Sequence, residues 1–194
     1  MESKWKIYRQ FERFGRLLFQ QGLVSLTAGN LSVRSGEIIY ITASGSMLGD
    51  LKYEDIVSVA LDEGRIPGVI DLKKPSMEII VHRSIYKNTD YKAIAHVHNP
   101  SAIAVSFKTD KVELADSEGR FYIPHVPVVA VNGGIASEDV AKVVPSILKD
   151  YPAVIVRSHG VFAAADTLDT ACSLASTIEF SSGILMRIQK NNMR

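Results

Sequence analysis

The chain has 194 residues, of which 46% are hydrophobic and 22% charged, and its formal net charge is +1. This balance is ordinary for a folded globular protein and excludes a disordered chain. Charges of both signs are mixed without a long basic run, so we expect no nucleic-acid partner. No apolar stretch reaches the roughly 20 residues of a membrane-spanning helix, and there is a single cysteine, Cys172. We therefore expect no membrane partner, no disulfide framework, a cytoplasmic location, and a single domain over residues 1–194.

Strand-like and helical patterns follow each other irregularly along the chain. Apolar periodicity predicts helices over residues 4–21, 75–87, 101–107 and 137–149, and a last helix to about residue 189 that Asp166 would cap. Short alternating or β-rich runs predict strands over residues 30–34, 37–42, 56–61, 93–97, 126–131, 153–157 and 161–165. The polar stretch 108–122 is expected to be a loop. This mixture predicts an α/β fold in which helices cover a mixed or antiparallel sheet.

Two histidines, His96 and His98, stand two residues apart at the end of the predicted strand 93–97. Alternate residues of a strand point to the same face, so both imidazoles can reach one point in space. His159 directly follows another predicted strand, between Ser158 and Gly160. Three neutral histidine ligands leave a zinc ion one open position for water or substrate. The pattern therefore favours a metal centre, against the alternative of ordinary hydrogen-bonded and turn histidines.

Glu78 lies in the first turn of the predicted helix 75–87, where a carboxylate near a metal could act as general base. The alternative is a surface glutamate. His82 follows four residues later on the same helical face, where it could hydrogen-bond Glu78, support the metal ligands from behind, or compete as a ligand, and we expect the supporting role. Cys172 is expected to be a core residue, and the pattern offers no partner for His125.

Three loops rich in small residues supply candidates for an anion site. They are Thr27-Ala28-Gly29-Asn30, Thr42-Ala43-Ser44-Gly45-Ser46 and Lys74-Pro75-Ser76. Backbone amides and hydroxyls in such turns are suited to a phosphate group. Each loop alone is equally a plain turn. Their grouping in the part of the chain that leads to Glu78 and the histidines favours a phosphate site.

The order of these motifs, T-A-G-N, T-x-S-G, K-P-S-x-E, H-x-H-N and S-H-G, resembles the class II aldolase and adducin head family, most of all its fuculose-phosphate aldolase branch. The resemblance implies a central, mainly antiparallel sheet between helical layers and a homotetramer with active sites at subunit interfaces. It implies a small-molecule substrate, a ketose 1-phosphate like L-fuculose 1-phosphate, cleaved to dihydroxyacetone phosphate and an aldehyde. It assigns Glu78 as the catalytic acid/base and His96, His98 and His159 as ligands of Zn²⁺, with Mn²⁺ or Co²⁺ as alternatives. It assigns the substrate phosphate to Thr27, Gly29, Asn30, Ser44, Gly45 and Ser76.

The chain departs from that branch in two places. Met77 stands where the branch has a second serine, which removes one hydroxyl from the expected phosphate pocket. The tyrosine that handles the aldehyde oxygen has no counterpart near Glu113, so the residue that assists there stays open. Asp116 and Glu113 are the candidates, since related ribulose-phosphate 4-epimerases resemble this arrangement with an aspartate in the same loop.

Three other functions stay open on the sequence. They are a sugar-phosphate 4-epimerase, a methylthioribulose-phosphate dehydratase, and a non-catalytic module like the adducin head. The presence of Glu78 together with all three histidines disfavours the module. The glutamate itself disfavours the dehydratase and, less strongly, the epimerase, whose matching residue is usually aspartate.

Overall fold

The computed structural model describes residues 3–62, 71–131 and 136–192. The strands are β1 (Asn30–Ser35), β2 (Ile38–Thr42), β3 (Ile56–Ala60), β4 (Ala93–Val97), β5 (Lys111–Glu113), β6 (His125–Val129), β7 (Ala153–Val156) and β8 (Gly160–Ala165). The helices are α1 (Lys4–Gln20), α2 (Ile79–Asn88), α3 (Pro100–Ser106), α4 (Ser117–Tyr122), α5 (Glu138–Leu148) and α6 (Leu168–Asn192), with 3₁₀ turns η1 (Leu48–Asp50) and η2 (Tyr53–Asp55).

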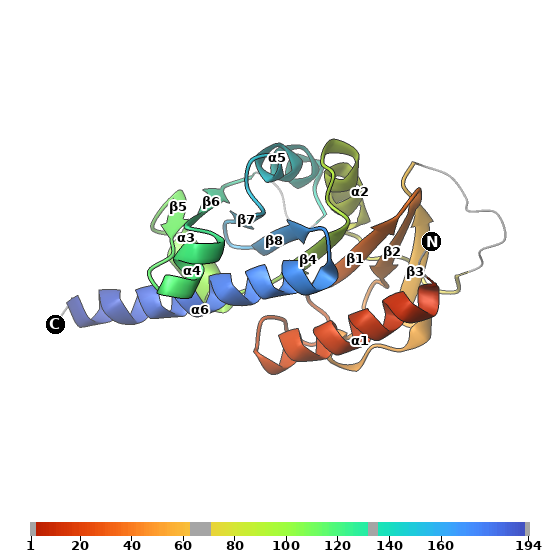
Figure 1. Cartoon of the computed structure of the whole chain (residues 1–194), viewed down its shortest axis with the longest axis horizontal. Coiled ribbons are helices and arrows are strands. Elements are labelled where there is room, and N and C mark those ends of the chain that lie inside the picture. The colour runs from red at the N-terminus through yellow and green to blue at the C-terminus, as the bar shows by residue number, and fades with distance from the viewer. Residues whose placement is uncertain (1–2, 63–70, 132–135, 193–194) are drawn as a thin grey trace.

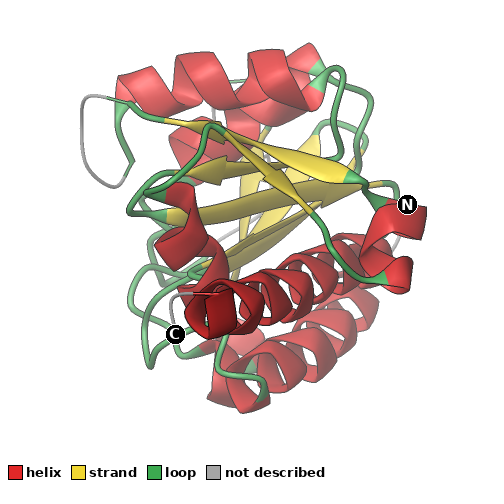
Figure 2. Ribbon diagram, turned by 90° about the vertical axis from the view of Figure 1, so that its left-hand side faces the viewer, coloured by secondary structure: helices red, strands yellow, loops and turns green. Residues whose placement is uncertain are grey.

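The strands form one sheet in the order β3-β2-β1-β4-β8-β7-β6-β5. Neighbouring strands pair antiparallel throughout, except for the parallel pair β6 and β7. Helices cover both faces of the sheet, so the molecule has three layers (Figure 2). This confirms the expected α/β fold with a mainly antiparallel central sheet.

The two faces of the sheet belong to two hydrophobic clusters. The face under α2 and α5 packs Ile94 of β4, whereas the face toward α1, α3 and α6 packs Ala95 (Figure 1). Because side chains alternate along a strand, His96 points to the α2 side with Ile94. The sheet thus directs this histidine toward the N-terminal end of α2, where Glu78 stands.

Residues 108–122, expected to be a loop, contain β5 and α4. Strand β5 has three residues, and only Val112 among them is buried. Helix α4 has six residues, and the Asp116 carboxylate caps it by accepting the Gly119 N–H at 2.8 Å. Elements this short carry no measurable periodicity, because a pattern needs two or more turns or several alternations to stand out.

Two helix starts also differ from expectation. Helix α2 begins at Ile79 rather than near Pro75, because the Ser76 N–H bonds Thr42 O at 2.9 Å and Pro75 forms a bridge with Ala43. Helix α6 is capped by Thr167, whose hydroxyl accepts the Thr170 N–H, and not by Asp166.

No helix in the described part of the chain is both long and apolar enough to cross a bilayer.

Candidate metal and substrate site

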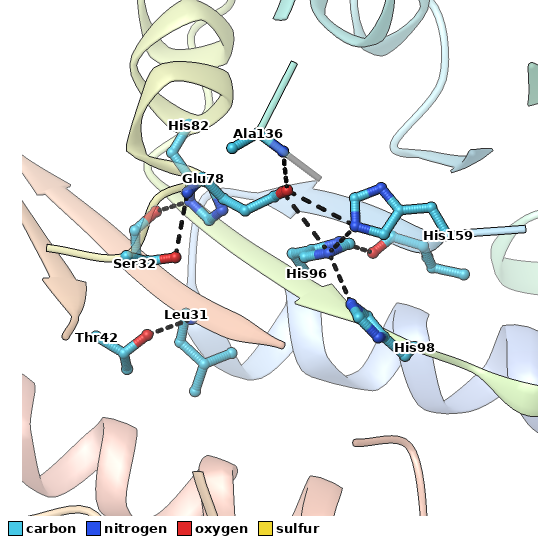
Figure 3. Close-up of polar contacts among 11 residues, drawn as sticks. Leu31, Ser32, Thr42, Glu78, His82, His96, His98, Ala136 and His159 are labelled. Carbon is cyan, nitrogen blue, oxygen red and sulfur yellow. Dashed lines mark hydrogen bonds and ion pairs between the residues drawn. The ribbon is translucent and has the colours of Figure 1, made fainter. Parts of the chain in front are cut away.

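Three histidine rings converge at one end of the central strands. His96 belongs to β4, His98 is the first residue beyond its end, and His159 lies in the turn between β7 and β8 (Figure 3). The Nε2 atom of His96 lies 3.2 Å from Nε2 of His98 and 3.2 Å from Nε2 of His159. Two nitrogens bound to one tetrahedral zinc at ordinary bond lengths would be about 3.3 Å apart. The spacing of these rings therefore fits a shared metal ion.

The orientation of the central ring is fixed by β8. The Nδ1–H of His96 donates to Val161 O at 3.0 Å, since a carbonyl oxygen can only accept. This contact leaves the lone pair of the neutral ring on Nε2, which faces the other two histidines. Phe162 stacks on the same ring, with centroids 4.0 Å apart. The metal-binding tautomer of His96 is therefore set by a backbone contact in the sheet.

Burial keeps the three rings neutral. Desolvation, together with the smaller effect of the nearby His98, lowers the pKa of His159 to about 4. Desolvation also lowers the pKa of His98, and it lowers the pKa of His96 well below its usual range together with the neighbouring histidines. Around neutral pH these rings therefore present lone pairs rather than protons, which is the state that metal binding requires.

Glu78 faces the histidines from the first position before α2. Its Oε1 accepts the Ala136 N–H at 2.8 Å, and its Oε2 is buried without a hydrogen-bond partner. Oε2 lies 3.7 Å from Nε2 of His96, and Oε1 lies 3.7 Å from Nε2 of His159 (Figure 3). Because these rings are neutral, the contacts are not ion pairs, and an unpartnered carboxylate oxygen beside three lone pairs fits a cation between them. Burial raises the pKa of Glu78, and the Ala136 N–H opposes that rise.

The Ala136 amide is a functional group that sequence reasoning missed. Ala136 has a φ of 58°, in the left-handed region. This conformation turns its N–H toward Glu78, which lies 58 positions earlier in the chain. Any residue except proline carries a backbone N–H, so no residue type marks such a contact in the sequence.

The small-residue loops and the histidines line one cavity of about 220 Å³. Its lining comprises Thr27, Ala28, Gly29, Asn30, Ala43, Ser44, Gly45, Ser76, Met77, Glu78, His96, His98 and His159. All six residues expected at the phosphate are thus brought together with the three expected metal ligands and with Glu78. No lysine or arginine is among the described residues of the lining, so its polar groups are hydroxyls and amides, besides the three imidazoles and the Glu78 carboxylate. A hollow of about 420 Å³ at Arg34, Gly36, Asp90, Tyr91, Lys92 and Asp166 shares none of these residues.

Gly29 is required where the loop meets the metal strand. Its φ is 80°, and a Cβ there would lie 2.6 Å from Val24 Cγ1 and 3.0 Å from His96 O. The next residue, Asn30, is the register partner of His96 across β1 and β4. The close approach of this backbone to His96 explains how a turn and a metal ligand come to share one cavity.

The acids expected on the aldehyde side lie outside this cavity. Glu113 is exposed on β5 and pairs with Lys111 at 2.9 Å. Asp116 caps α4 and does not line the cavity either. The structure therefore separates both residues from the histidines of their own chain.

His82 does not hydrogen-bond Glu78, which was one of its three possible roles, and it does not line the cavity. Its ring is fully buried, and its Nδ1 lies 2.6 Å from Ser32 Oγ, which in turn lies 2.7 Å from Tyr86 OH. Because Glu78 precedes the first turn of α2, its side chain turns to the cavity while His82 points into the core. The His82 Nε2 atom has no partner, and burial lowers the pKa of His82 to about 3.

The model of the family described as Class II Aldolase and Adducin N-terminal domain matches residues 9–186. L-fuculose phosphate aldolase of Methanocaldococcus jannaschii is 33% identical over 157 residues, covering 79% of this chain and 81% of that protein. Methylthioribulose-1-phosphate dehydratase of Sulfurihydrogenibium sp. is 30% identical over 177 residues, covering 83% of this chain and 80% of that protein. The crystal structure of L-fuculose-1-phosphate aldolase from Thermus thermophilus is 36% identical, with a TM-score of 0.88 and 95% of both chains covered. The chain thus belongs to the class II aldolase and adducin N-terminal domain family.

Proposed function

We propose that this chain is a metal-dependent sugar-phosphate aldolase that reversibly cleaves a ketose 1-phosphate, of the L-fuculose 1-phosphate kind, to dihydroxyacetone phosphate and an aldehyde. The observation that carries the proposal is the convergence of three neutral histidine nitrogens and the buried Glu78 carboxylate in one cavity. The similarity to two fuculose-phosphate aldolases supports the reaction class.

The loops around the cavity would bind the substrate phosphate. Thr27, Ser44 and Ser76, which carry hydroxyls, and the glycines of the turns all line the same space. Neutral donors of this kind can hold a phosphate dianion without a lysine or arginine. Anchoring one end of a short ketose in this way would place its reacting carbons beside Glu78 and the histidines.

His96, His98 and His159 would hold the divalent cation, for which we propose Zn²⁺, with Mn²⁺ or Co²⁺ as alternatives. When bound, the ion supplies Lewis acidity at the carbonyl end of the ketose. Cleavage breaks the C3–C4 bond and leaves its electron pair on C3, and the Glu78 carboxyl then gives C3 a proton. The raised pKa of Glu78 suits this step, because a carboxyl that holds its proton to higher pH is a better acid/base near neutrality. The Ala136 N–H occupies Oε1, so Oε2 is the oxygen free to face C3.

The aldehyde forms when the C4 hydroxyl gives up its proton. Asp116 and Glu113 are the residues that we propose for assistance on this side. Neither lines the cavity of its own chain, so either would act there only across a subunit interface. This is consistent with the homotetramer, with sites at subunit interfaces, that we also propose.

Exposed aromatic side chains support such an assembly. Phe121 on α4 is 81% exposed and Phe180 on α6 is 64% exposed, and aromatic side chains of this size contribute strongly when an interface buries them. Sedimentation velocity at micromolar concentration tests the proposal of a tetramer, and a monomer would contradict it.

We propose a cytoplasmic location because the one cysteine, Cys172, is buried and unpaired.

Proton exchange tests the reaction without a choice of aldehyde. Metal-loaded protein is incubated with dihydroxyacetone phosphate in heavy water and followed by NMR. We expect stereospecific loss of one hydroxymethyl proton, stopped by a chelator and by Glu78→Gln. If a protein with one metal ion per chain shows no exchange, the aldolase proposal is wrong.

A dehydratase is the second candidate, favoured by the methylthioribulose-1-phosphate dehydratase relative. Such an enzyme would eliminate water from its ketose phosphate and would not exchange dihydroxyacetone phosphate. The same protein offered methylthioribulose 1-phosphate should then release water from it. Turnover of that substrate with no exchange would favour the dehydratase. A chain that retains no metal after gentle purification would instead favour a non-catalytic module.

A further inference from the structure

The segment that follows the metal strand is attached to α6 at two points. Asn99 is fully buried, and its Nδ2 donates to Ala175 O at 2.7 Å. One helical turn further along α6, the Glu179 carboxylate accepts the Ser101 N–H at 3.0 Å through both oxygens and the Ala102 N–H at 3.3 Å. Ala175 and Glu179 are four residues apart and so share one face of α6. Figure 1 shows α3 lying alongside α6 at this position.

Helix α3 needs this external carboxylate because its own sequence supplies no cap. The first residue, Pro100, has no N–H, so the donors left without partners begin at Ser101. Asn99 stands at the position where an asparagine usually caps a helix, but its side chain is turned to Ala175 and makes no cap contact. Glu179 replaces it, and a carboxylate is also the group that the positive end of a helix favours.

The capped helix begins two residues after His98. This ligand lies beyond β4, and its backbone N–H bonds Leu23 O at 2.9 Å. On its other side the chain runs directly into Asn99 and α3. The place of the His98 ring relative to His96 therefore depends on how firmly the start of α3 is held against α6.

We propose that Glu179 is a positioning residue for the metal centre, which acts by capping α3 and so fixing His98 at the distance from His96 that a shared ion requires. The proposal rests on the metal centre of the proposed function and adds to it a residue 81 positions away from His98 in the chain, on the opposite side of the sheet from Glu78. It makes α6 part of the site although none of the described side chains of α6 lines the cavity.

Cobalt binding to the full chain tests this role without any substrate. Chelator-treated protein is titrated with Co²⁺ against a competing chelator, and the visible absorption of the bound ion is recorded. Partners that orient a ligand are typically worth 10–100-fold in metal affinity. We expect Glu179→Ala to raise the dissociation constant about 10-fold and to change the absorption spectrum. Glu179→Gln should largely restore both, because its amide oxygen still accepts the Ser101 N–H.

Thr167→Ala is the matched control. Thr167 caps the start of α6 through the Thr170 N–H, away from the site, so its loss removes one helix cap without touching α3. It should lower the melting temperature about as much as Glu179→Ala while leaving cobalt affinity and spectrum unchanged. In metal-free protein, NMR of the ring nitrogens should show His98 shifted by Glu179→Ala and His159 unshifted.

The outcomes separate the two proposals. If Glu179→Ala binds Co²⁺ with the wild-type affinity and spectrum, the positioning role is wrong and the metal centre stands. If Thr167→Ala weakens binding equally, the effect is general loss of stability and the positioning role is again wrong. If the wild-type chain binds no Co²⁺, the metal centre itself fails, and the role of Glu179 fails with it.

Discussion

His96 lies flat against Phe162, with ring centroids 4.0 Å apart and ring planes 16° from parallel. The two residues are register partners on β4 and β8, and both are buried. The stack limits rotation of the imidazole, while the contact to Val161 O selects its tautomer. The sheet therefore holds the central ligand by two independent contacts.

Replacing Phe162 with leucine should loosen this ligand. The variant keeps an apolar side chain in the core but loses the aromatic stack, which is worth about 0.5–1.5 kcal/mol beyond burial. We expect a comparable fall in the free energy of unfolding of the metal-free protein, together with weaker cobalt binding. Urea unfolding and cobalt titration measure the two effects. Metal affinity that stays at the wild-type value would show that the stack does not orient His96.

Glu78→Gln and His96→Ala should separate proton transfer from metal binding. The glutamine keeps the shape of the side chain but cannot exchange a proton, so we expect a loss of about 10²–10⁴-fold in turnover with metal content unchanged. His96→Ala removes the central ligand, and we expect both metal and activity to be lost. Elemental analysis and the heavy-water exchange assay check these outcomes. Undiminished exchange by Glu78→Gln would remove its assignment as the acid/base.

His82 should make the metal-free protein less stable in mild acid. Burial lowers its pKa to about 3 in the folded chain, whereas an unfolded histidine titrates near 6.5. Between these values the unfolded chain binds a proton that the folded chain does not, so stability falls as pH decreases, by about 1.4 kcal/mol per pH unit. In His82→Gln the free energy of unfolding should change less steeply between about pH 6 and pH 4. Urea unfolding at each pH measures this free energy. If it depends equally steeply on pH in the two proteins, His82 takes up the proton in the folded chain as well.

Gly29→Ala should be more harmful than Gly36→Ala. Both glycines have left-handed φ values, 80° and 62°, so each alanine pays a similar conformational cost of about 1–2 kcal/mol. A Cβ at Gly29 also meets Val24 and His96 O, whereas a Cβ at Gly36 meets nothing within 4 Å. We therefore expect the larger drop in melting temperature, and the only loss of metal affinity, in Gly29→Ala. Equal effects of the two variants would show that the loop containing Gly29 can shift to make room for a Cβ without disturbing β4.

Much of the site could be predicted because its signals are local. The two-residue period of a strand places His96 and His98 on one side, and residues just beyond strands, such as His159, reach the same edge of a sheet. Small residues in turns mark loops where a backbone can approach a ligand, as at Gly29. Each of these inferences needs only a few neighbouring residues, and all these side chains line one cavity.

The parts that could not be predicted depend on contacts between distant segments. Glu179 meets Ser101 across 78 positions, and Ala136 meets Glu78 across 58. His82 has the correct spacing for Glu78, but the late start of α2 gives it Ser32 as partner instead. A helix of six residues such as α4, or a strand of three such as β5, is stabilised by its neighbours and leaves too little pattern of its own.

The position of the histidines in the sheet has a consequence for how an ion would bind. His96 belongs to an interior strand, between β1 and β8, and His159 to a turn of only a few residues between paired strands. The loss of conformational entropy needed to gather the ligands therefore takes place when the sheet folds, not when the ion arrives. Metal should enter a ready-made set of nitrogens, and its binding enthalpy should contain little contribution from refolding of the chain.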